Sequence, residues 1–335
     1  MDFEKLLERV AEEPTLKDCC GLLESAKGYD EIRMLFGFAS KLRDEKVGRV
    51  LKLDSFIYPV KKCVMEKYCI YCSNYVEKFR LEPLSHEEFC RAVEFIKECG
   101  MKRVTLEGGY NPDNSKIPEF IRIAREAGLE VALDIYPISR NELKIFKSLG
   151  VSEVYASIEI ADEELFKQFK PSESLEDRIK LAKEICMLKI GLSSTLLVGL
   201  PGVRDEVCIK GVLLLREFDC LRHLTISGFN PVFGTPLESS SPASPIAVAK
   251  FVALARILLP EKDIFAAGSV SLQSLPLMLF AGANRAYLGA YVCRARTGKG
   301  FADGLDEVFK QKYEAKVVDG LVFADPSKAV EKNLI

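Results

Sequence analysis

The stretch GLSSTLLVGLPGVRDEVCIKGVLLLREFDCLRHLTISGF, residues 191–229, contains the unit from which we infer the fold. Residues 191–199 and 222–229 are short runs of apolar and β-branched side chains, which is typical of strands. Residues 205–217 between them have the amphipathic pattern of a helix. Two strands joined by a crossover helix lie parallel in a sheet, so this stretch predicts a βαβ unit.

The same alternation extends in both directions along the chain. The expected strands cover residues 51–60, 103–108, 130–136, 153–159, 191–199, 222–229, 264–268 and 285–289. The expected helices between them cover residues 85–99, 115–127, 140–149, 174–188, 205–217, 244–258 and 273–281. Eight such units predict a closed, parallel (β/α)8 barrel of the TIM type. A doubly wound open sheet is the alternative.

The remaining segments define the domain organisation. Residues 1–50 are expected to form N-terminal helices, residues 51–294 the barrel, and residues 295–335, which are charged and weakly periodic, a short C-terminal extension. A length of 335 residues suits a single α/β barrel, and 48% hydrophobic residues can fill a large core.

Composition excludes several classes of protein. The net charge is −2 and the basic residues form no stripe, so we expect no nucleic-acid partner. No apolar run reaches the roughly 18 residues that a membrane span requires. The charged N-terminus lacks the apolar core of a secretory signal, and we therefore expect a cytoplasmic protein without a membrane partner.

Unusual residues follow the expected strands at their carboxyl ends, where barrel enzymes place their active sites. Three cysteines follow the first strand, EGGY (107–110) follows the second, and Glu159 ends the fourth. GLPG (199–202) follows the fifth strand and FNPVFGTP (229–236) the sixth. This agreement supports the barrel over the open sheet.

The chain has eleven cysteines, an odd number in a chain that is not small, so we do not expect a disulfide framework. Most are interpreted as small apolar core residues. They include Cys90, Cys99, Cys186, Cys208 and Cys220. Cys63, Cys69 and Cys72 differ because they gather among Lys, Tyr and Asn in a loop.

Three thiols suggest one particular metal group. A structural zinc site takes four closed ligands, and His86 and His223 lie elsewhere in the sequence. A redox Cys-x-x-Cys pair would not need Cys63. A [4Fe–4S] cluster usually takes four thiolates, so three leave one iron open to an amine and a carboxylate. S-adenosylmethionine (SAM) provides both groups, and we favour this interpretation over zinc or simple redox chemistry.

YCIYCSNY (68–75) resembles the cluster loop of radical SAM enzymes, in which three cysteines are spaced Cys-x3-Cys-x2-Cys with an aromatic residue before the last. Here the aromatic residue is Tyr71, and the first gap has five residues. Further stretches resemble the biotin synthase branch, which includes the maturase HydE and methylornithine synthase. They are SLEDRIKLAKEI, STLLVGLPG, FGTPL, FVALARILLP and FAGANRAYLG. The five-residue gap is similar to the HmdB (HcgA) type, which takes part in biosynthesis of the iron-guanylylpyridinol cofactor of [Fe]-hydrogenase.

The resemblance implies roles for individual residues. Cys63, Cys69 and Cys72 would hold the cluster. The other expected SAM-binding residues are Tyr71 by its backbone at the adenine, Gly108 and Gly109 near the methionine moiety, Ser157 and Glu159 at the ribose or amine, Arg178 at the carboxylate, and Val198 and Leu200 beside the adenine. On spacing alone, Arg178 would be a solvated helix residue.

Biotin synthase holds a second, sulfur-donating cluster inside its barrel. The corresponding positions here are Thr105, Ala132, Ser193 and Ile264, so we do not expect sulfur insertion. Hydroxyl groups on the same strands suggest a polar substrate, although some of them are expected only to satisfy strand backbone. The candidate substrate residues are Thr105, Tyr136, Ser193, Thr195 and Asn230.

The resulting hypothesis is a radical SAM enzyme of the HmdB type. Its expected partners are a small-molecule substrate, an electron donor such as ferredoxin or flavodoxin, and other cofactor-assembly proteins. Two alternatives remain at this stage. One is another enzyme of the same branch, like HydE or methylornithine synthase, and the other is a non-catalytic iron–sulfur scaffold.

Overall fold

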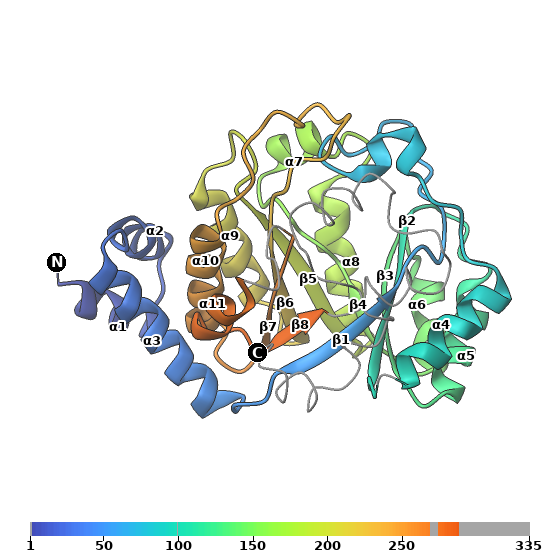
Figure 1. Cartoon of the computed structure of the whole chain (residues 1–335), viewed down its shortest axis with the longest axis horizontal. Coiled ribbons are helices and arrows are strands. Elements are labelled where there is room, and N and C mark those ends of the chain that lie inside the picture. Colours follow the sequence, from blue (N-terminus) through green and yellow to red (C-terminus); the bar gives the residue numbers. More distant parts are fainter. Residues whose placement is uncertain (1, 99, 269–273, 288–335) are drawn as a thin grey trace, which may run out of the picture. The chain divides into compact units, whose positions relative to one another are not determined.

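The computed structural model describes residues 2–98, 100–268 and 274–287 (Figure 1). Eight strands close in chain order into a barrel, which confirms the (β/α)8 prediction. The strands are β1 (Lys52–Ile57), β2 (Arg103–Tyr110), β3 (Glu130–Tyr136), β4 (Val151–Tyr155), β5 (Gly191–Val198), β6 (Leu221–Gly228), β7 (Asp263–Gly268) and β8 (Arg285–Tyr287). Neighbouring strands pair in parallel, as crossover helices require.

Helices precede the barrel and connect its strands. They are α1 (Phe3–Glu12), α2 (Leu16–Ser25), α3 (Tyr29–Lys46), α4 (His86–Glu98), α5 (Ile117–Glu126), α6 (Arg140–Ser148), α7 (Glu163–Phe169), α8 (Leu175–Met187), α9 (Asp205–Arg216), α10 (Pro245–Leu258) and α11 (Leu275–Phe280). Only α7 had not been expected among these. It is seven residues long and begins at Asp162, whose side chain accepts a hydrogen bond from the backbone of Leu165.

The chain divides into two compact units, and one contains residues 1–52, 67–72 and 155–286. In this unit the N-terminal helices pack on α10 and α11, as Figure 1 shows for α3. Arg43 of α3 donates hydrogen bonds to the backbone carbonyls of Leu279 and Ala283. The core of α10 is almost wholly apolar, with Val248, Phe251 and Leu254 buried. Helix α10 packs on β6 and β7, and burial of its apolar side chains stabilises this part of the barrel.

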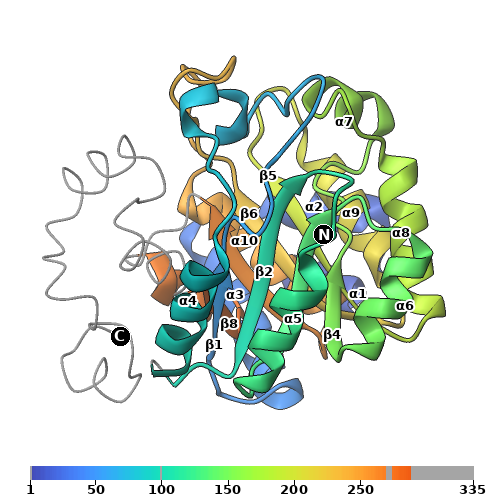
Figure 2. The same ribbon diagram turned by 90° about the vertical axis from the view of Figure 1, so that its right-hand side faces the viewer.

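The other unit contains residues 53–66 and 73–154. Strands β1 to β4 lie here, with α4, α5 and α6 as the crossover helices (Figure 2). Phe89 of α4 and Phe120 of α5 stack with ring centroids 4.2 Å apart, which joins the two helices. Ser139 and Glu142 form a reciprocal capping box that starts α6.

Two strands end earlier than the sequence predicted: β1 stops at Ile57 instead of residue 60, and β4 stops before residue 159. β4 stops at Tyr155, and Glu159 has a backbone φ of 55°, in the left-handed region. The amides of Ala156 and Glu159 donate to the carbonyls of Ser193 and Thr195, so the chain before Glu159 contains one residue more than β5 opposite it. Because of this bulge, Ser157 and Glu159 do not share one face of a strand, although both belong to the fourth strand expected from the sequence.

Two predictions about cysteines need correction. Cys186 and Cys220, interpreted as core residues, form a disulfide with their Cα atoms 5.4 Å apart, which suits such a bond. It joins the end of α8 to the start of β6, and contacts of this kind cannot be inferred from spacing. Cys90 is half-buried and lies 3.5 Å from His86.

Two further predictions concern the segment after the barrel and the absence of a membrane span. The expected C-terminal extension, residues 295–335, and Cys99 lie outside the described residues. Within the described part of the chain, no helix combines the length and the apolar character that crossing a membrane would take.

Candidate active site

The second half of the cysteine loop, residues 67–72, lies against residues 169–173, which we call the docking segment. The amide of Ile70 donates to the carbonyl of Phe169 at 3.0 Å. The hydroxyl of Ser172 accepts from the amide of Lys67 at 3.0 Å and donates to its carbonyl at 2.9 Å. Cys69 Sγ lies 3.8 Å from a carboxylate oxygen of Glu173. Three residues of the loop are therefore held by a segment about a hundred positions later in the sequence.

The first half of the cysteine loop runs beside the end of β2. The amides of Val60 and Val64 donate to the carbonyls of Glu107 and Tyr110, at 2.8 and 2.6 Å. A Cβ on Gly109 would lie 2.5 Å from the Cα of Cys63, and one on Gly108 would lie 2.5 Å from Cγ of Lys61. Gly109 is thus needed where the backbone of Cys63 passes β2, and Gly108 where the side chain of Lys61 does.

A line of four charged side chains leads away from the loop. The Tyr71 hydroxyl donates to Glu159, which pairs with the Lys170 ammonium at 2.7 Å. Lys170 also lies 3.3 Å from Glu173. Glu173 accepts from Nε and Nη2 of Arg178, the former at 2.9 Å. We call Glu159, Lys170, Glu173 and Arg178 the charge line.

Burial makes these ionisations depend on one another. Burial alone would lower the pKa of Lys170, but the carboxylates of Glu159 and Glu173 raise it above its ordinary value. Burial would raise the pKa of Glu173, and Arg178 with Lys170 lowers it below its usual range. Burial raises the pKa of Cys69 despite the nearby Lys170, and burial with the Glu159 charge raises that of Tyr71. Lys170 and Glu173 are therefore ionised at neutral pH, while Tyr71 and the metal-free Cys69 thiol are protonated.

A pocket of about 260 Å³ opens beside Glu159. Its lining consists of Tyr71, Cys72, Glu159, Thr195, Leu197, Ser227, Gly228, Phe229 and Asn230. The walls come from the cysteine loop, the residues after β4, and the carboxyl ends of β5 and β6. A volume of this size suits part of a nucleoside or a small polar molecule.

Some predicted residues meet at this pocket and others do not. Tyr71, Glu159, Thr195 and Asn230 line it. Val198, expected beside the adenine, lies on the same face of β5 as Leu196. The methyl groups of Leu196 lie against Gly211 of α9, so this face is turned toward the helices. The apolar wall of the pocket comes from Leu197 on the opposite face. Ser157 and Leu200 are buried beside the pocket without lining it.

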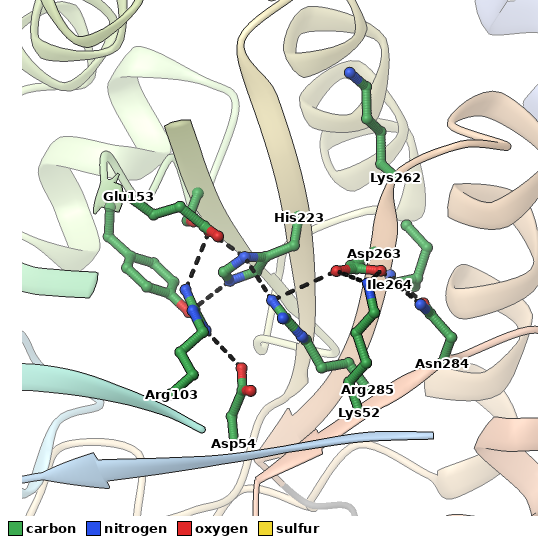
Figure 3. Close-up of polar contacts among 12 residues, drawn as sticks. Lys52, Asp54, Arg103, Glu153, His223, Lys262, Asp263, Ile264, Asn284 and Arg285 are labelled. Carbon is green, nitrogen blue, oxygen red and sulfur yellow. Dashed lines mark hydrogen bonds and ion pairs between the residues drawn. The ribbon is translucent and has the colours of Figure 1, made fainter. Parts of the chain in front are cut away.

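Ser193 lies one layer nearer the amino end of β5, in register with His223. Its hydroxyl is 3.1 Å from Nδ1 of His223, and the Tyr155 hydroxyl is 2.6 Å from Nε2. Arg285 joins His223 to Asp263, as Figure 3 shows. This buried network makes Ser193 part of the floor of the barrel in this unit.

The other unit has a polar interior of its own. Arg103 pairs with Asp54 and Glu153, all nearly inaccessible to solvent (Figure 3). Further along β2 and β3, Glu107 is in register with Asp134, and burial together with the Asp134 charge raises the pKa of Glu107 well above 4.5. Thr105 is buried between Phe56 and Ala132, and the ring centroids of Tyr136 and Tyr110 lie 5.6 Å apart.

One position assigned to the barrel interior was wrong. Phe265 is in register with Thr225, which is in turn in register with Thr195 of the pocket wall. Ile264, its neighbour, therefore has the opposite parity and faces the helices. Thr105, Ala132 and Ser193 keep the interior parity.

Lys170 and Glu173 were not identified from the sequence. They lie in FKPSES (169–174), a turn without periodicity, and only the fold brings them to Glu159 and Arg178. Lys61 was also missed. It is buried, bonds the carbonyls of Asn111 and Tyr136, and burial lowers its pKa to about 8. A lysine within a mostly apolar strand end was the one available signal.

Among the described residues, no three His, Cys, Asp or Glu side chains are grouped as a metal site. Cys69 and Cys72 belong to one unit and Cys63 to the other. The predicted cluster ligands therefore remain a prediction.

Comparison with known proteins covers most of the chain. Residues 57–209 match the family model of the Radical SAM superfamily, and residues 225–303 match that of the Biotin and Thiamin Synthesis associated domain. The uncharacterized protein MJ0785 of Methanocaldococcus jannaschii is 29% identical over 261 residues, which is 75% of this chain and 68% of that protein. The [FeFe] hydrogenase maturase subunit HydE of Thermotoga maritima is 26% identical over 294 residues, 84% of this chain and 81% of HydE.

The fold is shared with a solved structure. Methylornithine synthase (PylB) superposes with a TM-score of 0.74 at 24% identity, over 84% of this chain and 85% of PylB. This similarity supports the barrel architecture with its additional N-terminal helices.

Proposed function

Because the chain is a radical SAM enzyme of the biotin synthase-like branch, we propose that it binds a [4Fe–4S] cluster through Cys63, Cys69 and Cys72 and acts on a small polar molecule. One observation carries this proposal most directly. The loop that contains Cys69 and Cys72 is docked so that Tyr71 meets Glu159 inside the pocket that Cys72 also lines. A ligand in the pocket would thus touch both the cysteine loop and the carboxyl group of Glu159.

The residues present fit such a cluster. Three thiols are soft ligands suited to iron–sulfur groups, and they lie in one loop at the carboxyl end of β1. The glycines at 108 and 109 leave the backbone of Cys63 unobstructed. When bound and reduced, the cluster supplies the electron that splits SAM into methionine and a 5′-deoxyadenosyl radical.

The residues around the pocket would bind and orient SAM. Glu159, the most exposed member of the charge line, is placed to accept from the ribose hydroxyls or the ammonium group. Arg178 would hold the carboxylate through its planar fork. Leu197 and Phe229 provide apolar walls that exclude water from the reacting carbon.

We place the reaction in biosynthesis of the iron-guanylylpyridinol cofactor of [Fe]-hydrogenase, as for the HmdB type. The support is the five-residue gap between Cys63 and Cys69. The substrate would be polar, because Thr195, Ser227 and Asn230 line the pocket and the buried hydroxyl of Thr225 has no partner among the described residues. An external donor such as ferredoxin or flavodoxin would provide the electron, and other cofactor-assembly proteins would use the product.

Sulfur insertion does not fit the proposed chemistry. Thr105, Ala132 and Ser193 have interior parity, but none of them provides a thiolate for a second cluster. A radical formed here could act by hydrogen abstraction, rearrangement or fragmentation.

Cluster binding is tested by anaerobic reconstitution with iron and sulfide. We expect about four irons per chain in the unmodified protein, loss of the cluster absorption in Cys69→Ala, and no loss in Cys90→Ala. Cys90 is a matched control because it is also half-buried and free. Iron retained by Cys69→Ala and lost from Cys90→Ala would refute the ligand assignment.

The pathway is tested separately by deleting the gene in its host and measuring the [Fe]-hydrogenase cofactor. Loss of the cofactor supports the HmdB type. The second candidate is an enzyme like HydE, which the match over 84% of this chain favours. Unchanged cofactor after deletion would favour that candidate.

A further inference from the structure

The charge line contains two members that no comparison assigns. Lys170 lies between the carboxylates of Glu159 and Glu173, and Glu173 lies between Lys170 and Arg178. The side chains of Lys170, Glu173 and Arg178 are only 4%, 3% and 7% exposed, whereas that of Glu159 is 20% exposed. The two inner groups are thus enclosed, and the outer group Glu159 faces the pocket.

The inner pair is also held in place by its own surroundings. The Lys170 amide donates to the carbonyl of Phe166 at 2.8 Å, and the Glu173 amide donates to the carbonyl of Lys170 at 3.0 Å. The Lys170 ammonium lies 5.2 Å from the centre of the Phe166 ring. These contacts hold the turn that carries Lys170 and Glu173, whose charged groups lie 3.3 Å apart, and they involve neither Glu159 nor Arg178.

The charges of the line sum to zero, and this constrains what can bind. A buried ion that loses its partner is strongly destabilising. If Glu159 turned to an incoming ammonium and Arg178 to an incoming carboxylate, Lys170 and Glu173 would each lose one partner. They would remain compensated, because they already form a pair with each other.

We propose that Lys170 and Glu173 are positioning residues, an inner counter-ion pair that frees Glu159 and Arg178 to bind the two charges of a zwitterionic amino-acid moiety. This rests on the proposed function, in which that moiety is the methionine part of SAM. Binding then exchanges two ion pairs for two others and leaves no buried charge alone. A ligand without the ammonium and carboxylate gains nothing from the exchange.

The test compares SAM with 5′-methylthioadenosine, which has the nucleoside but lacks both charged groups. Dissociation constants are measured on anaerobically reconstituted protein for the unmodified chain, Lys170→Met, Glu173→Gln and the double variant. We expect each single variant to lose affinity for SAM by about tenfold or more and to keep its affinity for methylthioadenosine within about threefold. The double variant has no unpaired inner charge, so it should recover most of the preference for SAM.

The exposed pair Lys210 and Glu206, 2.7 Å apart on α9, provides the control. Lys210→Met and Glu206→Gln should change neither dissociation constant. If a single variant fails to fold, the double variant still decides. A double variant that binds methylthioadenosine but has lost the preference for SAM overturns the inner-pair proposal, as do single variants that bind SAM normally. An unmodified protein without preference for SAM overturns the proposed function, and the inner pair with it.

Discussion

Glu107 and Asp134 place two carboxyl groups side by side on β2 and β3, at the interior face of the strands. Burial, together with the charge of Asp134, raises the pKa of Glu107 well above its ordinary value of 4.5. The folded chain therefore holds a proton on Glu107 more tightly than the unfolded chain does. Stability from this group is present at low pH and is lost as the pH rises through its folded-state pKa.

Replacement of Glu107 by Gln should remove that loss. We expect the free energy of unfolding of Glu107→Gln to exceed that of the unmodified protein at neutral pH, because the amide cannot ionise next to Asp134. The difference should shrink as the pH falls toward about 4, where both forms of residue 107 are neutral. Urea unfolding at several pH values measures this difference.

The exposed Glu94 on α4 is the control for this prediction, since Glu94→Gln should show no comparable dependence on pH. A Glu107→Gln variant that is less stable than the unmodified protein at every pH would contradict the argument. Such a result would mean that the carboxylate of Glu107 has a stabilising partner in the barrel.

Sequence reasoning at the residue scale found the members of the site that belong to a motif. Tyr71 was identified because it precedes the last cysteine of the loop, as in the family that the loop resembles, and Glu159 because it was expected to end the fourth strand. Both line the pocket. Lys170 and Glu173 could not be identified, because a charged turn has the same composition whether it is solvated or buried. Their role depends on contacts with Glu159 and Arg178 that only the folded chain provides.

The docking segment holds the end of the five-residue gap between Cys63 and Cys69. Residues 64–67 belong to this five-residue gap, and the side chains of Val64, Glu66 and Lys67 are exposed. The amide of Lys67 and its carbonyl are nevertheless tied to Ser172. The element thus combines exposed side chains with a fixed backbone at its end.

Ser172→Ala removes both of these hydrogen bonds and tests the docking. Each is worth about 1 kcal/mol, so hydrogen exchange at residues 67–70 of the cluster-free protein should become at least tenfold faster. Mass spectrometry of exchanged peptides gives this rate. Ser148→Ala, which removes a 2.7 Å bond to the carbonyl of Ile145 at the end of α6, should leave the loop unchanged. Equal exchange in both variants would show that the loop is held by other contacts.

The ends of helices could be predicted from the sequence where the amphipathic pattern extends over several turns. The helices at 205–216 and 245–258 agree with expectation to within a residue or two, because their apolar faces repeat over several turns. The end of β4 could not be predicted in this way. The left-handed backbone at Glu159 arises from its pairing with β5 and not from the local sequence. Short α7 has too few turns for a period to appear.

For the whole molecule, alternation of strands and helices predicted eight parallel strands, and the unusual residues at the expected strand ends favoured the closed barrel over an open sheet. Eight parallel strands with both faces buried can be arranged in few topologies. The right-handedness of crossover connections excludes most of these. The disulfide between Cys186 and Cys220 and the polar floor around His223 were beyond reach. Both join residues on different elements, and the spacing of residues along the chain does not show which of them meet in the fold.

The polar interior makes a prediction about the whole enzyme. Biotin formation needs a sulfur atom, and three of the positions that the resemblance aligns with the sulfur-cluster ligands of biotin synthase carry Thr105, Ala132 and Ser193 in this chain. We therefore expect reconstituted, reduced protein supplied with SAM and dethiobiotin to form no biotin. It should still release 5′-deoxyadenosine slowly, because the proposed cleavage of SAM would depend on the cysteine loop and the charge line and not on these three residues. Chromatography of both products tests this, with a biotin synthase as the positive control. Biotin formed in proportion to 5′-deoxyadenosine would mean that sulfur comes from a source other than a second cluster, and would assign this chain to sulfur insertion.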